Sequence, residues 1–136
     1  MTLPAHEAIE AAVSSFRREK LFDGVEMAVV ALRKGESSTY HSHSRTRDVF
    51  FVMSGRLTIT LRIDSPVSTS AYETLSAMPY EIRCMPNGQF VHSVRALPGD
   101  VVVVKPGTVH CAANVDDAPC HFVCIEGVGE YDFLPA

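Results

Sequence analysis

Four residues of this chain carry side chains that bind metal ions, at spacings that can bring them together. His41 and His43 are two residues apart in a segment with strand character, so both imidazoles point to the same face of the strand. Asp48 follows a short connection at the start of the next apolar run, and a hairpin would carry its carboxylate to the same interior. Two histidines and one carboxylate leave positions of a metal ion open to other molecules.

A third histidine comes from a distant part of the sequence. His110 follows a tight turn at residues 106–107 and can reach the same interior from another strand. Cys111 adjoins His110, and Tyr40 and Ser42 flank the other two histidines. Strand alternation turns these three side chains to the opposite face, so we leave them outside the site.

From residue 25 onward, short apolar or alternating segments are separated by glycine and proline. The expected strands are 27–32, 37–43, 49–53, 57–62, 91–97, 101–104 and 122–125. Many short strands with such turns are typical of an all-β sandwich, jelly roll or closed barrel.

A short helix is predicted over residues 5–20, and it ends at the Asp-Gly pair 23–24. Its apolar stripe at helical spacing consists of Ile9, Ala12, Val13 and Phe16. This pattern divides the chain into an N-terminal helical segment, 1–24, and a β-barrel domain, 25–136. We expect the helix to cover one face of the barrel.

Two segments, 49–53 and 101–104, are apolar in both phases of a strand. A strand of this kind is buried on both faces. One face can line the barrel interior, and the other needs a cover, which is either the N-terminal helix or a second subunit. We therefore favour a homodimer.

The segment 64–88 contains three prolines and a cluster of serine and threonine, with a strand expected near 72–75. Loops of this length are uncommon in compact domains unless they have a function. It is interpreted either as a lid or as a hairpin inserted at the barrel mouth. Side chains here that can transfer protons are Tyr72, Glu73, Tyr80 and Glu81.

Composition limits the partners and the compartment. The chain has 136 residues, a net charge of −4 and no tryptophan, and it lacks the basic stripe expected of a nucleic-acid-binding protein. No apolar run is long enough to span a membrane, and no signal peptide is evident. The four cysteines form no Cys-x-x-Cys pair, so we expect reduced thiols and a cytoplasmic location.

The histidines and the glycines around them resemble the two motifs of the cupin family. The first motif, G-(x)5-H-x-H-(x)4-E-(x)6-G, is matched from Gly35 to Gly55 at every spacing, with Asp48 in place of glutamate. The second, G-(x)5-P-x-G-(x)2-H-(x)3-N, is matched from Gly99 to Asn114. There the proline is shifted by one place, and lysine occupies its usual position.

This resemblance implies an antiparallel cupin or jelly-roll barrel of six to eight strands, often dimeric. It also implies a metal ion inside the barrel, bound by His41, His43, Asp48 and His110. Aspartate is one methylene shorter than glutamate, so Asp48 either contacts the ion or acts through a water molecule or a neighbouring imidazole.

Three imidazoles and a carboxylate suit a divalent transition metal: Fe, Mn, Ni, Co or Zn. Our first hypothesis is a metal-dependent enzyme, resembling the dioxygenases, isomerases or polyketide cyclases among small cupins, that acts on a small oxygenated organic molecule. The alternative is a non-catalytic, metal-dependent module that binds or senses a small ligand. A purely structural cupin is disfavoured by the intact set of three histidines.

Overall fold

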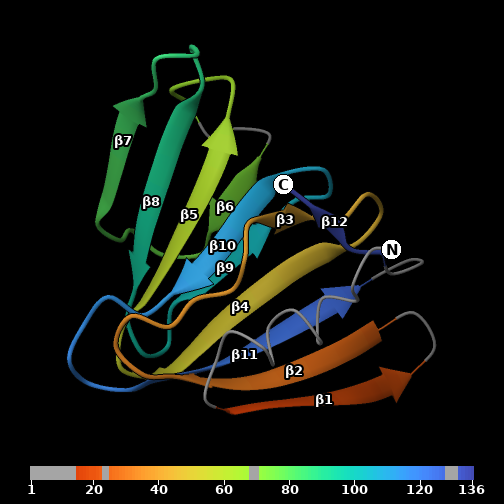
Figure 1. Cartoon of the computed structure of the whole chain (residues 1–136). Helices are drawn as coiled ribbons and strands as arrows, with labels where there is room; N and C mark the ends of the chain where they lie inside the picture. Colours follow the sequence, from red (N-terminus) through yellow and green to blue (C-terminus); the bar gives the residue numbers. More distant parts are fainter. Residues whose placement is uncertain (1–14, 23–24, 68–70, 128–131) are drawn as a thin grey trace.

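The computed structural model shows two six-stranded antiparallel sheets that face each other (Figure 1). It describes residues 15–22, 25–67, 71–127 and 132–136. Sheet A contains, in spatial order, β1 (Ser15–Phe22), β2 (Val25–Leu32), β11 (Cys120–Gly127), β4 (Arg47–Ser54), β9 (Val101–Val104) and β6 (Tyr72–Thr74). Sheet B contains β12 (Leu134–Pro135), β3 (His41–Ser42), β10 (Val109–Ala113), β5 (Leu57–Ile63), β8 (Phe90–Ala96) and β7 (Tyr80–Cys84). This arrangement confirms the predicted all-β jelly-roll fold.

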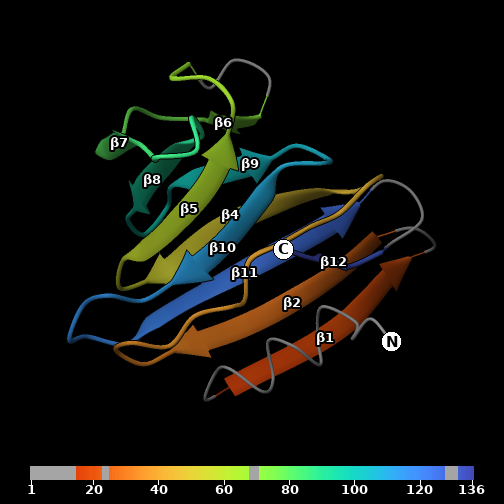
Figure 2. The same cartoon turned by 45° about the horizontal axis from the view of Figure 1, so that its top comes forward.

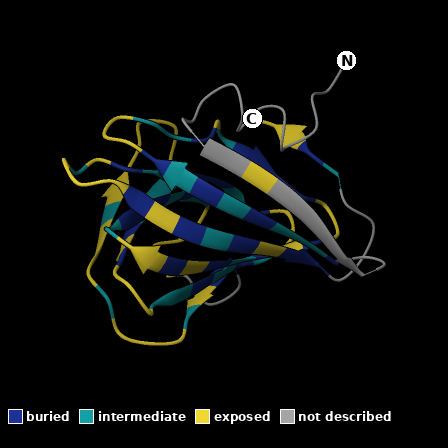
Figure 3. Cartoon of the chain, turned by 90° about the horizontal axis from the view of Figure 1, so that it is seen from below, coloured by how far each residue is buried: buried dark blue, intermediate teal, exposed yellow. Residues whose placement is uncertain are grey.

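The two sheets face each other, as the tilted view in Figure 2 shows, and the core is made of the buried residues on their inner faces. Along the strands, buried residues alternate with more exposed ones (Figure 3). In β4, for example, Phe50 and Val52 face inward, whereas Phe51 and Met53 are exposed. The period-two pattern of the sequence therefore sets which side chains reach the interior.

The predicted helix over residues 5–20 is wrong where the structure tests it. Residues 15–20 belong to β1, which pairs with β2 in antiparallel register, Arg17 opposite Val29. The apolar stripe rested mainly on residues 9–13, which lie outside the described part of the chain. From residue 17 onward the segment is rich in charge, as is typical of an edge strand, and its backbone completes the hydrogen bonding of β2.

The segment 64–88 supplies edge strands to both sheets. The strand expected near residues 72–75 is confirmed as β6, which pairs with β9. A second strand, β7, pairs with β8 in the other sheet. Because β6 and β7 belong to different sheets, this segment is not an inserted hairpin.

One row of cross-strand neighbours on the inner face of each sheet organises the interior. The row in sheet A runs Glu126, Asp48, Val104, Tyr72. The row in sheet B runs His41, His110, Leu61, His92. The two rows contact each other at two places, since His110 hydrogen-bonds Asp48 and Tyr72 hydrogen-bonds His92.

No helix occurs among the described residues, so none there is long and apolar enough to cross a membrane.

Candidate metal centre

Each of the three histidines is held by a backbone carbonyl through its Nδ1 atom. The acceptors are Thr39 O for His41 at 2.7 Å, Asp132 O for His43 at 2.6 Å and Thr108 O for His110 at 2.8 Å. A carbonyl oxygen only accepts hydrogen bonds, so Nδ1 carries the hydrogen in each ring. This leaves the three Nε2 atoms to face the interior, an arrangement typical of metal-binding histidines.

Asp48 faces these Nε2 atoms from the opposite sheet. Its Oδ2 atom lies 2.8 Å from Nε2 of His110 and 3.1 Å from Nε2 of His43. One donor atom from each of His41, His43, Asp48 and His110 lies within 4.8 Å of every other, and all four residues are buried. The structure thus brings together all four residues selected from the sequence.

The pKa values of the buried side chains in this site depend on one another. Burial, together with the neighbouring His110, lowers the pKa of His41 to about 4. Burial acts to lower the pKa of His43 as well, but the hydrogen bond and charge of Asp48 outweigh it and raise this pKa to about 9. Burial acts to raise the pKa of Asp48, yet the hydrogen bonds from His110 and His43 hold it well below its usual range. The carboxylate is therefore ionised and attracts positive charge.

These residues fit a divalent cation. The Oδ1 atom of Asp48 is buried and has no hydrogen-bond partner, and an unsatisfied buried carboxylate oxygen is costly unless a cation or a donor satisfies it. The donor set of three imidazole nitrogens and one carboxylate, without a thiolate, is one that divalent transition metals accept.

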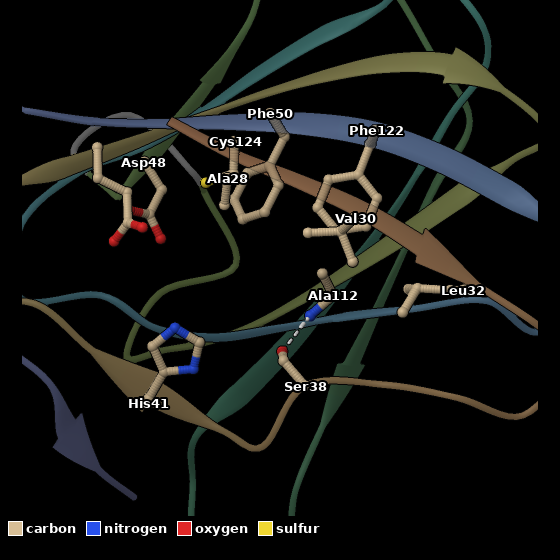
Figure 4. A pocket seen from close by; sticks show the side chains of 11 residues that line it. Ala28, Val30, Leu32, Ser38, His41, Asp48, Phe50, Ala112, Phe122 and Cys124 are labelled. Carbon is tan, nitrogen blue, oxygen red and sulfur yellow. Dashed lines mark hydrogen bonds between the residues drawn. The ribbon is translucent and has the colours of Figure 1, made fainter. Parts of the chain in front are cut away.

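The cavity beside the site is small and mostly apolar. Its volume is about 20 Å³, which is room for roughly one water molecule. Figure 4 shows Asp48 and Phe50 on one side of it and His41 on the other, with the hydroxyl of Ser38 accepting a hydrogen bond from the backbone of Ala112. Phe50 and Phe122 contribute aromatic rings to this apolar lining.

Three neighbours of the candidate ligands were not predicted from the sequence. Glu126 is buried in β11, and its Oε2 atom lies 3.6 Å from Nε2 of His43. Asp132 supplies the carbonyl that holds His43, and its carboxylate accepts hydrogen bonds from the backbone and hydroxyl of Ser44. Phe133 packs against the ring of His41. Glu126 could have been found from the sequence, because it is a charged residue in the same strand phase as the apolar Phe122 and Cys124. The sequence contains no comparable signal for Asp132 or Phe133.

The other side chains considered from the sequence lie away from the site. Tyr72 hydrogen-bonds His92, and Glu73 pairs with Lys105 at 2.9 Å. Tyr80 and Glu81 are exposed. Cys111 is buried next to Tyr40, outside the group of candidate ligands, as the alternation of the strand predicted.

Comparison with known proteins identifies the class. The cupin family profile matches residues 9–127, and the chain belongs to the cupin family. No curated protein matches the chain.

Solved structures with the same fold share little sequence with the chain. A Bacillus subtilis oxalate decarboxylase variant has a TM-score of 0.58 and 19% identity, covering 83% of this chain and 24% of its own. An oxalate oxidase has a TM-score of 0.57 and 20% identity, covering 82% and 45%. Peruvianin-I, described as a cysteine peptidase from Thevetia peruviana latex, has a TM-score of 0.56 and 16% identity, covering 83% and 56%. The chain thus spans about a quarter to a half of their lengths, and the likeness concerns the fold.

Proposed function

We propose that this cupin is a metal-dependent enzyme that acts on a small oxygenated organic molecule. The observation that carries this proposal is the convergence of three imidazole Nε2 atoms on Asp48, each ring fixed through Nδ1 by a backbone carbonyl. A divalent ion held there would polarise a carbonyl or enolate oxygen or activate dioxygen. The apolar walls of the cavity would keep bulk water away from the reacting groups.

We propose His41, His43, Asp48 and His110 as the ligands. Two ligands at right angles on an ion about 2.1 Å away are about 3 Å apart, and Asp48 Oδ2 lies 2.8 Å and 3.1 Å from two of the imidazole nitrogens. This spacing supports direct contact between Asp48 and the ion, despite its short side chain.

The candidate metals are Fe, Mn, Ni, Co and Zn, all of which accept imidazole and carboxylate ligands. Mn(II) is the first to test, because a structure of oxalate decarboxylase with the same fold is described in terms of its Mn(II) centres.

Elemental analysis and metal titration test the site. We expect one divalent ion per chain in the wild-type protein and none in a His41→Ala, His110→Ala double variant. Asp48→Asn, which keeps the shape but removes the charge, should weaken binding at least tenfold. His121→Ala, which changes an exposed histidine in β11, is the matched control. A double variant that retains the metal would refute the ligand assignment.

A non-catalytic, metal-dependent binding module is the second candidate. It is favoured by the small cavity and by the burial of the ligands, which are at most 4% exposed. An activity assay distinguishes the enzyme from the binding module. The protein is loaded with Fe(II), Mn(II) or Ni(II) and given dioxygen together with small keto, enol or phenolic compounds. Turnover in any sample supports the enzyme. Metal-dependent ligand binding without turnover across the panel supports the module.

We also propose a homodimer formed through the outer face of sheet A. Phe51 and Met53 are 42% and 53% exposed there, and the same face carries Met27, Val29, Val49, Val101, Val103, Val123 and Ile125. A continuous apolar face of this kind is typical of an interface. Light scattering should give a dimer that Phe51→Glu converts to a monomer, with Val115→Glu in an exposed loop as the control. A monomeric wild-type protein would exclude this interface.

A cytoplasmic location is proposed on the state of the cysteines. None of the four takes part in a disulfide bond in the described chain, as expected in a reducing compartment.

A further inference from the structure

A second cavity lies at the opposite edge of the two sheets from the three candidate ligand histidines. Its volume is about 350 Å³. The polar side chains that line it are Tyr72 and Thr74 from β6, Tyr80 from β7 and His92 from β8. Apolar side chains, including Met78, Ile82 and Val94, form most of the remaining wall. Ligand sites in proteins commonly have this composition, an apolar wall with a few polar groups that converge.

Two of these polar side chains form a buried hydrogen-bonded pair. The Nε2 atom of His92 lies 2.9 Å from the carbonyl oxygen of Ser65, so Nε2 is the donor in that bond. In the neutral ring, Nδ1 is then an acceptor, and the hydroxyl of Tyr72, 3.1 Å away, donates to it. The Tyr72 proton is thereby directed to His92, and its phenol oxygen can accept a hydrogen bond from another molecule.

This pair is separate from the candidate metal centre. Leu61 lies between His92 and His110 in sheet B, and Val104 lies between Tyr72 and Asp48 in sheet A. Leu61 is 0% exposed and Val104 is 1% exposed, so a buried apolar side chain of each sheet lies between this pair and the candidate ligands. The proposed metal chemistry therefore makes no use of Tyr72 or His92.

Size distinguishes the two cavities. The cavity beside the metal ligands holds about 20 Å³, whereas the second holds about 350 Å³, which falls within the usual range of about 300–1,000 Å³ for small-molecule sites. We propose that the second cavity binds a small, largely apolar molecule with a hydroxyl group, which donates a hydrogen bond to the oxygen of Tyr72. The aromatic ring of Tyr80 and the aliphatic side chains would contact the apolar body.

The probe for this site is 2-naphthol, a fluorescent molecule with one hydroxyl donor on an apolar two-ring body. The chain has no tryptophan, so the probe can be excited without competing protein emission. We expect saturable binding of 2-naphthol, with affinity at least fivefold higher than for 2-methoxynaphthalene, which lacks the donor. Tyr72→Phe should lower the 2-naphthol affinity about fivefold, the effect of losing one hydrogen bond.

Tyr40→Phe is the matched control, because Tyr40 lies outside this cavity with its ring over the guanidinium of Arg62. It should bind 2-naphthol as the wild type does. The comparison of 2-naphthol with 2-methoxynaphthalene uses only the wild-type protein, so it tests the proposal even if Tyr72→Phe folds poorly. Equal affinity for both ligands would overturn the proposal, as would Tyr72→Phe that is folded by circular dichroism and binds 2-naphthol with unchanged affinity.

Discussion

The ring of Phe133 packs against the ring of His41, with centroids 4.8 Å apart and planes inclined by 34°. Phe133 belongs to the segment 132–136, which pairs with β3 through β12 and holds His43 through the carbonyl of Asp132. This segment lies directly against two of the candidate ligands, and Phe133 itself is buried. Phe133 therefore covers His41 on this side of the site.

We expect Phe133→Ala to speed the exchange of the bound metal. Removing the ring leaves the equilibrium contacts of the ligands intact but opens a path to His41, so extraction by excess chelator should become at least fivefold faster. The equilibrium affinity should change less than threefold. Stopped-flow measurements with a chromogenic chelator check both values. Leu134→Ala, at an exposed neighbouring position, is the control, and equal extraction rates in all three proteins would refute this role of Phe133.

The glycines that frame the first motif differ in what surrounds them. A Cβ atom on Gly55 would lie 2.3 Å from the carbonyl oxygen of Pro119 and 2.8 Å from Cα of Cys120, whereas one on Gly35 would meet nothing within 4 Å. Both have positive φ, 75° and 82°. We expect Gly35→Ala to cost about 1 kcal/mol of unfolding free energy from backbone strain alone. Gly55→Ala should cost about 3 kcal/mol or more, because the clash with the backbone adds to the strain. Urea unfolding measures both, and similar losses would contradict the distinction.

The sequence predicted the candidate ligands well because their positions follow from local geometry. His41 and His43 share a strand face by period alone, and the short connection 44–47 carries Asp48 into the facing sheet. The reach of Asp48 was left open because it depends on the separation of the two sheets, which no local pattern encodes. The structure places its carboxylate within hydrogen-bond distance of two imidazoles.

The features that the sequence predicted wrongly or did not predict depend on contacts between distant segments of the chain. Residues 15–20 were predicted as helix because local charge patterns do not show that β2 has an open edge for pairing. Tyr72 was one of four side chains considered for proton transfer, and the structure pairs its hydroxyl with His92, twenty residues away in the other sheet. Asp132 acts on His43 through its backbone carbonyl, which every residue possesses, so its identity carried no signal.

Metal binding should release a proton. The hydrogen bond and charge of Asp48 raise the pKa of His43 to about 9, so this ring is protonated at pH 7.5 in the metal-free protein, whereas a ligating nitrogen carries no proton. Calorimetric titration with Mn(II) in buffers of different ionisation enthalpy should give about one proton released per ion. The affinity should rise roughly tenfold per pH unit between pH 6.5 and 8.5. A titration without proton release would show that His43 is not a ligand or is already neutral.

The stability of the metal-free protein should be greatest near pH 6.5. Folding raises the pKa of His43 from 6.5 to about 9, so its contribution is complete below pH 6.5 and is lost as the pH rises to 9. Folding lowers the pKa of His41 to about 4, so this residue opposes folding increasingly as the pH falls from 6.5 to 4. We expect the unfolding free energy to fall by about 2 kcal/mol between pH 6.5 and 9. His43→Asn, whose side-chain amide can still donate to the Asp132 carbonyl, should flatten this decline in chelator-treated samples. A wild-type protein whose stability rises over that interval would contradict the proton-sharing between His43 and Asp48.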